Sequence, residues 1–163
     1  MKPLSAIPAA GFAAAALLLS APTVQAQPDL YVSNFTIDKT TLKEGQTLRW
    51  SVSITQGRLL QSSAACTGGI YLSEDPVINP ALDRLLVTLA IPALGTWPLN
   101  VANWTNRTLT IPRFKDGPCY IGVYADNTFK VRETNEGNNY VRKAVTCVTL
   151  KPDLTPVGLT VSG

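Results

Sequence analysis

Short runs of β-branched, aromatic and aliphatic residues fill residues 29–150, and clusters of Gly, Pro, Asn and Asp separate them. The clearest run, QTLRWSVSI at 46–54, alternates apolar and polar residues, which is typical of a strand with one face in a core and one in water. We expect seven strands, at 29–37, 46–54, 69–73, 84–91, 106–111, 119–125 and 139–150. This pattern predicts an all-β fold, a seven-stranded antiparallel immunoglobulin-like β-sandwich.

The N-terminus has the three parts of an export signal. Lys2 supplies a positive charge, residues 6–21 form a short apolar run, and VQA at 24–26 supplies small residues for cleavage. We therefore predict a signal peptide at 1–26, cleaved after Ala26, and a secreted or periplasmic mature chain. The apolar run is shorter than a membrane span needs, so we expect no membrane-spanning segment. The predicted sandwich domain covers residues 27–150.

The chain contains no histidine. This excludes Ser-His and Cys-His nucleophilic pairs and every zinc site that uses histidine. A hydrolase built only from carboxylates remains possible. The Lys and Arg residues are scattered along the chain and form no stripe, which gives nucleic-acid binding little support.

Three cysteines in an exported chain suggest one disulfide and one spare thiol. Cys119 and Cys147 would face each other if their two strands fold back as a hairpin centred near Glu133. The same register pairs apolar residues on one face, Ile121 with Val145 and Ala125 with Val141. We predict a Cys119–Cys147 disulfide, which closes a loop of about 28 residues and contributes roughly 3 kcal/mol. Cys66 is then a small buried residue.

The stretch VRETNEGNNY, at 131–140, is unusually acidic and amide-rich for a link between two strands. In the reading we favour, its Asn side chains bond to nearby backbone and close a wide loop. In the alternative, the loop binds calcium (Ca²⁺), which prefers six to eight oxygen ligands. The candidate ligands are Asp126, Glu133, Glu136 and Asn138.

The end of the chain resembles the start of the predicted domain. KPDLTPVGLTV near the C-terminus repeats the pattern of QPDLYVSNFTI at residues 27–37. Residues 151–163 therefore resemble the first strand of a second repeat. A frayed tail is the simpler interpretation, but residues 152–163 could also mediate self-association by adding to another sheet edge.

Four pieces of the sequence together resemble the CARDB family, the cell-adhesion-related domain found in bacteria. They are PDLYVSNFTIDKTTLKEGQTLRWSVSI, GIYLSEDPVINPALDRLL, IPRFKDGPCYIGVYAD and VRETNEGNNYV. The resemblance spans roughly residues 28 to 150 and implies an immunoglobulin-like sandwich in an exported protein. It also implies a role as a spacer or a binding module. The two hairpin cysteines and the long TQGRLLQSSAAC segment depart from the family pattern.

These features predict a non-enzymatic module without a certain cofactor that binds a protein or cell-surface partner. One alternative is an accessory module of an exported enzyme such as a protease or glycosidase. Another is an assembly protein that uses its C-terminal strand for β-augmentation. We interpret Trp50, Trp97 and Trp104 as core or end-capping residues rather than a ligand platform, because they are scattered along the sequence.

Overall fold

A computed structural model describes residues 27–58 and 60–151. The predicted signal peptide, its cleavage site and the repeat-like residues after Lys151 lie outside the described residues. The described residues form eight strands and one short 3₁₀ helix, in this order: β1 (Leu30–Ile37), β2 (Thr41–Lys43), β3 (Thr47–Gln56), β4 (Cys66–Ser73), β5 (Arg84–Ile91), β6 (Val101–Thr110), β7 (Gly117–Tyr124), η1 (Glu136–Asn138) and β8 (Tyr140–Val148).

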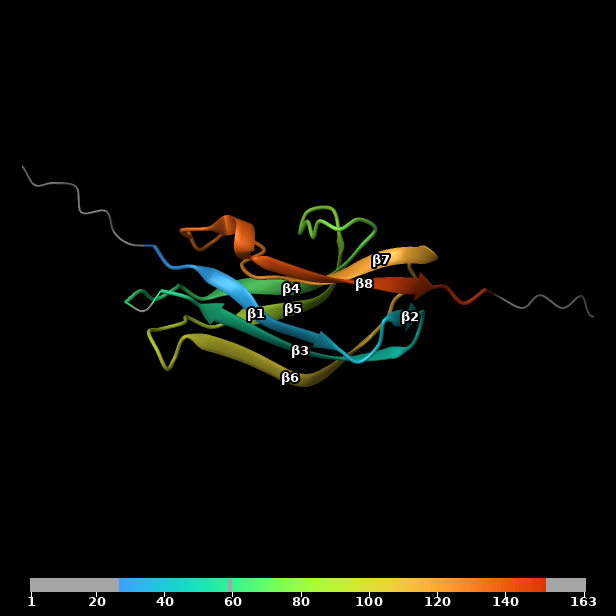
Figure 1. Cartoon of the computed structure of the whole chain (residues 1–163), viewed down its shortest axis with the longest axis horizontal. Coiled ribbons are helices and arrows are strands. Elements are labelled where there is room, and N and C mark those ends of the chain that lie inside the picture. Colours follow the sequence, from blue (N-terminus) through green and yellow to red (C-terminus); the bar gives the residue numbers. More distant parts are fainter. Residues whose placement is uncertain (1–26, 59, 152–163) are drawn as a thin grey trace, which may run out of the picture.

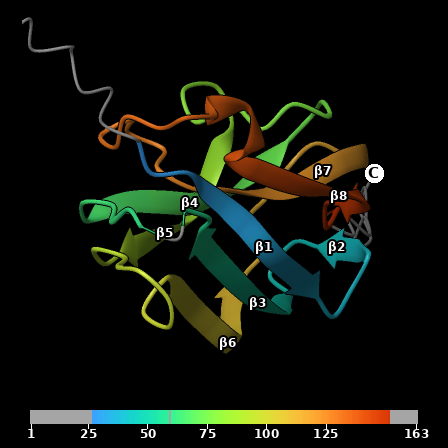
Figure 2. The same ribbon diagram turned by 60° about the vertical axis from the view of Figure 1, so that its left-hand side comes forward.

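The strands form two sheets packed face to face, as Figures 1 and 2 show. One sheet has the order β1-β3-β6, and the other has the order β2-β8-β7-β4-β5. The predicted all-β sandwich is therefore confirmed, with eight strands in place of seven. The additional strand, β2, has only three residues, too few to show an alternation in the sequence. It pairs with β8 in parallel, so the sandwich is not wholly antiparallel as predicted.

The main core lies between the sheets and follows the alternation of the sequence. In β3, Leu48, Trp50, Val52 and Ile54 are buried. In β1 the alternation slips after Val32, which predicts a bulge, and the pairing with β3 shifts between Val32 and Asn34. Burial of such side chains is the main favourable contribution to folding of a sandwich of this kind.

A second, smaller cluster lies on the outer face of the five-stranded sheet. Tyr71 and Tyr124 are buried there beneath Ile78, which comes from the β4–β5 loop at 74–83. Gly122 in β7 leaves the space that Ile78 fills, because a Cβ at Gly122 would lie 2.4 Å from the Cγ1 atom of Ile78. The loop is thereby fixed against the sheet.

The hairpin of β7 and β8 is shifted by two residues from the predicted register. Cys119 pairs with Val145, while Cys147 pairs with Gly117. A shift of two keeps every side chain on its predicted face, so apolar patterning cannot detect it. The predicted pairs Ile121–Val145 and Ala125–Val141 are therefore wrong.

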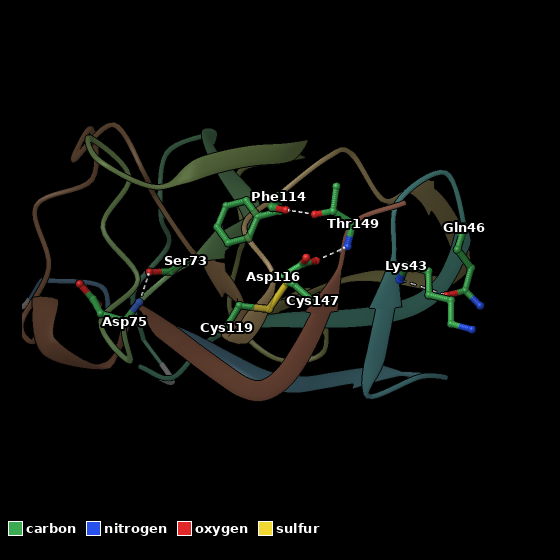
Figure 3. The surroundings of a disulfide bond; sticks show 9 residues. All are labelled: Lys43, Gln46, Ser73, Asp75, Phe114, Asp116, Cys119, Cys147 and Thr149. Atoms are coloured by element: carbon green, nitrogen blue, oxygen red, sulfur yellow. Dashed lines mark hydrogen bonds between the residues drawn. A yellow bond between two sulfur atoms is a disulfide. The ribbon is translucent and has the colours of Figure 1, made fainter. Parts of the chain in front are cut away.

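The Cys119–Cys147 disulfide nevertheless forms between β7 and β8 (Figure 3). The two cysteines are diagonal neighbours on the inner face, with their Cα atoms 6.1 Å apart. Beyond the disulfide, Thr149 follows β8 and bonds to Asp116 and to the carbonyl of Phe114. These contacts fix the end of β8 to the segment that precedes β7.

Candidate functional site

Three loops meet at one end of the sandwich, which we call the loop end. They are the β3–β4 loop (57–65), the β5–β6 loop (92–100) and the β7–β8 loop (125–139), and they lie at the left of Figure 1 beside residues 27–29. Figure 2 shows the β3–β4 loop between the other two. In immunoglobulin-like sandwiches, loops gathered at one end form a natural binding surface.

Backbone hydrogen bonds join these loops into one unit. In the β3–β4 loop, Ser63 donates its N–H to the carbonyl of Leu94 in the β5–β6 loop, at 2.8 Å. Gly57 donates to the carbonyl of Asp29, and Thr134 of the β7–β8 loop donates to the carbonyl of Pro28. The segment at 27–29 therefore connects the β3–β4 loop to the β7–β8 loop.

Glu133 is the centre of the β7–β8 loop. Its side chain is 6% exposed and accepts hydrogen bonds from the backbone N–H of Leu30 and from Asn139 Nδ2. Glu136 accepts from the N–H of Glu133 and from Asn139 Nδ2. The two carboxylates thus fix the loop to itself and to the start of β1.

Of the three asparagines predicted to bond to nearby backbone, only Asn135 does so through its side chain, whereas Asn138 and Asn139 donate to carboxylates. Asn135 caps η1, since its Oδ1 accepts from the N–H of Gly137 at 3.0 Å. Asn138 donates from Nδ2 to Asp29 at 3.1 Å. In contrast, Oδ1 of Asn138 and Oδ1 of Asn139 are buried and accept no hydrogen bond from the residues that the structure describes. These two oxygens are the unsatisfied acceptors of the loop.

Burial changes the acid–base properties of two groups at this end. Removal from water raises the pKa of Glu133 to about 7, and the nearby Glu136 and Asp126 carboxylates also raise it. The N–H of Leu30 acts in the opposite direction. Burial likewise raises the pKa of the Cys66 thiol to about 12, with a further contribution from Asp126 and Glu133. Cys66 is buried, as the sequence predicts.

The four candidate calcium ligands all lie in the β7–β8 loop. Hydrogen bonds already engage the three carboxylates, whereas Oδ1 of Asn138 has no donor among the described residues. Asp126 is fully buried and accepts from the N–H of Val131 at 2.6 Å. Glu133, Glu136 and Asn138 make the contacts given above. Among residues 27–58 and 60–151, no three His, Cys, Asp or Glu side chains form a group suited to hold a metal ion. Calcium binding therefore stays a prediction.

The loop end also exposes large apolar side chains that the sequence does not predict. Leu60 in the β3–β4 loop is 87% exposed, and Trp97 and Leu99 in the β5–β6 loop are 74% and 76% exposed. Phe129 in the β7–β8 loop is exposed as well. The interpretation of Trp97 as a core or capping residue is wrong, while Trp50 is buried as expected. Single apolar residues in loops have no periodicity, so the sequence offers no signal for them.

Comparisons with known proteins give a family model and several similar folds. The CARDB family model matches residues 27–143. A solution structure of the CARDB domain of a Pyrococcus furiosus protein is 18% identical, with a TM-score of 0.55, over 76% of this chain and 98% of that chain. A crystal structure of the same archaeal domain was determined in complex with di-metal ions, with a TM-score of 0.52.

A further similar structure is the 272–376 domain of a putative cell surface protein from Methanosarcina acetivorans. It is 17% identical, with a TM-score of 0.52, over 75% of this chain and 93% of that chain. At such identities the solved structures support the fold alone. No curated protein is similar enough to match the chain. Among the described residues, no helix has the length and hydropathy that a membrane span requires.

Proposed function

The chain belongs to the CARDB family, and from that premise we propose that it is an exported, non-catalytic module that binds a protein or a cell surface through its loop end. The observation that carries the proposal is the exposure of Leu60, Trp97 and Leu99 on neighbouring loops. Large apolar side chains that gather on a soluble protein usually mark an interaction site. Trp is also among the residues that dominate binding energy at interfaces.

The disulfide supports export, because disulfides persist in oxidising compartments outside the cytoplasm. The absence of histidine and the engagement of the buried carboxylates in hydrogen bonds support a non-catalytic role. Asp126 and Glu133 stabilise a loop at the loop end, and their oxygens bond to backbone N–H groups of the chain itself.

Binding of the labelled mature chain, residues 27–163, to intact cells of the producing organism tests this proposal. We expect saturable binding that unlabelled chain displaces, and loss of binding in the triple variant Leu60→Ser, Trp97→Ser, Leu99→Ser. A matched control changes three exposed apolar residues outside the loop end, Val77, Leu82 and Leu150, to Ser. Equal binding by the two triple variants would exclude the loop end as the binding surface.

The unsatisfied oxygens favour a second proposal, that the β7–β8 loop takes up Ca²⁺. Oδ1 of Asn138 and Oδ1 of Asn139 are buried without a donor in the described part of the chain, and buried polar atoms rarely remain unpaired. Neutral amide oxygens beside carboxylates are ligands that calcium accepts. Glu133 and Glu136 lie in hydrogen-bonding contact with Asn139, so a small rearrangement of the loop could turn these groups toward one cation.

A further inference from the structure

We propose that two copies of the chain pair along β5, so that their five-stranded sheets form one continuous sheet across a twofold axis. The surface concerned is the free edge of β5, at residues 84–91. It excludes the three loops of the loop end, so this pairing goes beyond the proposed function.

The outer edge of β5 has no partner strand. β5 is the last strand of its sheet and pairs with β4 alone (Figure 2). One side of its backbone therefore carries N–H and C=O groups that no strand among the described residues pairs. Arg84 is its single charged residue, and residues 85–91 are Leu, Val, Thr, Ala and Ile. Leu85 is 47% exposed. A free edge of this composition is a template for another strand.

The other three sheet edges are protected from pairing. β2 has only three residues. The first N–H of β1 is bonded to Glu133, and the strand is bulged after Val32. β6 is interrupted in its middle, where its register with β3 shifts and Asn106 has a φ of 51°. In β5 the register shift lies near the start, at Leu86, and leaves 87–91 regularly paired with 66–70. Short strands and bulges prevent edge-to-edge pairing, so β5 is the edge best suited to it.

Two β5 strands fit each other when they pair antiparallel about Leu89. Val87 then lies opposite Ile91 of the second copy, and Leu89 lies opposite its own counterpart. These side chains belong to the main core, so the pairing extends the core from one copy to the next. Thr88 lies opposite Ala90 of the second copy on the outer face, where both residues are exposed. Matched apolar pairs of this kind stabilise neighbouring strands.

No like charges oppose each other in this pairing. Arg84 lies opposite residue 94 of the second copy, and the β5–β6 loop at 92–100 contains no charged residue. Like charges placed directly opposite destabilise a strand pair, and their absence favours an identical partner. A twofold axis produces such self-complementary contacts and is the commonest symmetry of soluble oligomers. A second copy is therefore the occupant that this edge fits.

The pairing gives the two loop ends opposite directions. β5 runs toward the loop end, because the β5–β6 loop follows Ile91, and antiparallel pairing reverses the second copy. If the loop end binds a cell surface, as proposed above, the dimer has one binding end on each side and can bridge two cells. This consequence rests on the proposed function, whereas the pairing of β5 does not.

The mass of the mature chain, residues 27–163, measured by sedimentation over a range of concentrations, tests the pairing. We expect a monomer at about 1 µM and a dimer at about 1 mM, because a short strand pair is at the small end of specific interfaces. Thr88→Lys should weaken the dimer roughly tenfold or more, since lysine on an edge strand opposes pairing. Circular dichroism checks that each variant is folded.

Thr108→Lys is the matched control for this variant. Thr108 is exposed on β6, the free edge of the other sheet, so the same substitution adds the same charge to a different edge. The control should dimerise as the unaltered chain does. Equal weakening by the two substitutions would mean that the added charge, and not the edge of β5, controls association, and would overturn the proposal.

Engineered cysteines test the register. In the Thr88→Cys, Ala90→Cys variant each new thiol lies opposite a thiol of the second copy, so oxidation should give a covalent dimer that a reductant separates. The Thr108→Cys, Thr110→Cys variant has the same spacing on β6 and should give far less covalent dimer. Equal yields from the two variants would count against pairing along β5.

Three further results would overturn the proposal. They are a monomer at about 1 mM, a dimer that Thr88→Lys leaves unchanged, and a dimer that is lost when residues 151–163 are deleted, since that tail would then be the partner strand. Cell binding is scored separately. A Thr88→Lys chain that binds cells but no longer aggregates them supports both the pairing and the proposed function. An intact dimer that binds no cells removes the proposed function and leaves the pairing.

Discussion

Glu133 accepts a hydrogen bond from the backbone N–H of Leu30, a residue 103 positions earlier in the chain. Through this contact the β7–β8 loop holds the first residue of β1 against the five-stranded sheet, and Thr134 adds a second contact at Pro28. A buried carboxylate therefore connects the start of the sandwich with its last hairpin. Its protonation state should affect the stability of the whole domain.

We predict that Glu133 makes the domain less stable as the pH rises from about 4.5 to about 7. Its pKa is raised from 4.5 to about 7 in the folded chain, mainly by burial, so the folded state favours the protonated form. This contribution is fully present below pH 4.5 and is lost as the pH rises through 7. Relative to Glu133→Gln, the unaltered chain should lose roughly 2 kcal/mol over this range, measured by urea unfolding.

The comparison of Glu133→Gln with the unaltered chain isolates this group, because other carboxylates titrate in both proteins. Glu74→Gln is the matched control, since Glu74 is exposed and paired with Lys115 outside the loop end. Between pH 4.5 and 7 the control should lose stability by the same amount as the unaltered chain. Parallel stability curves for Glu133→Gln and the unaltered chain would show that Glu133 has an ordinary pKa in the folded state.

The disulfide should contribute a large part of the stability of this small domain. Cys119 and Cys147 are 28 residues apart, and closing a loop of that length stabilises the folded state by about 3 kcal/mol on the chain-entropy estimate. The Cys119→Ala, Cys147→Ala variant should lose about this much free energy of unfolding. Cys66→Ala is the control, because it leaves the disulfide intact. Equal stability with and without a reductant would contradict the prediction.

This disulfide also indicates how far the sequence determines the fold. Alternation in the two strands predicts which side chains face the core, and both cysteines are on that face. The predicted register of β7 and β8 differs from the observed one by two residues. A shift of two preserves the alternation, and the long loop at 125–139 does not define a symmetric turn that would fix the register. The bond still forms, because diagonal neighbours on one face lie within reach.

The loop end shows the limit of such reasoning. The acidic and amide residues at 131–140 are conspicuous in the sequence, and the backbone contact of Asn135 could be predicted from the side-chain type. The contact of Glu133 with Leu30 could not, because the two residues are far apart in the chain. The exposed Leu60 and Trp97 could not, because an isolated apolar residue in a loop is equally compatible with burial and exposure. Strand β6 was also predicted to begin at 106, whereas it begins at Val101; in its first half only Ala102 is buried and Trp104 partly buried.

Cys66 should be inert in the folded chain. It is 6% exposed, and burial raises the pKa of its thiol to about 12, so the reactive thiolate is almost absent at neutral pH. A thiol reagent at about pH 8 should label the native protein slowly, and should label one thiol per chain at once after unfolding in denaturant without reductant. Rapid labelling of the native chain would mean that Cys66 is accessible.

Gly122 should be required for the packing of the β4–β5 loop. A Cβ at this position would lie 2.4 Å from Ile78 Cγ1 and 2.8 Å from the carbonyl oxygen of Val141. We expect Gly122→Ala to destabilise the domain by about 1–3 kcal/mol, as overpacking usually does. Gly95→Ala is the control, because its Cβ would make only ordinary contacts, at 3.7 Å or more.

A double-mutant cycle with Ile78→Ala separates the two contacts of Gly122. Removing the Ile78 side chain relieves one clash, so the double variant should lose less free energy than the sum of the single variants. The clash with the backbone oxygen of Val141 remains, so recovery should be partial. Strict additivity would show that Ile78 does not occupy the space above Gly122.

Calcium binding by the β7–β8 loop should appear as stabilisation against heat. A ligand at about a hundredfold excess over its dissociation constant adds about 2.7 kcal/mol, which is several degrees for a domain of this size. We expect the mature chain to unfold at a higher temperature in millimolar Ca²⁺ than in EDTA. The rise should vanish in Glu133→Gln, Glu136→Gln, because these carboxylates bond to Asn139, whose Oδ1 lacks a donor.

The Glu74→Gln chain again provides the control and should keep the calcium response. If calcium still raises the unfolding temperature of the Glu133→Gln, Glu136→Gln variant, the ion binds elsewhere. The exposed carboxylates Glu74 and Asp75 of the β4–β5 loop would then be the next candidate ligands. If calcium does not raise the unfolding temperature, Asp126, Glu133 and Glu136 serve only to hold the loop through their hydrogen bonds. The loop then serves to fix β1 and to carry Phe129 and the cations at 130 and 132, and the contact surface needs no metal.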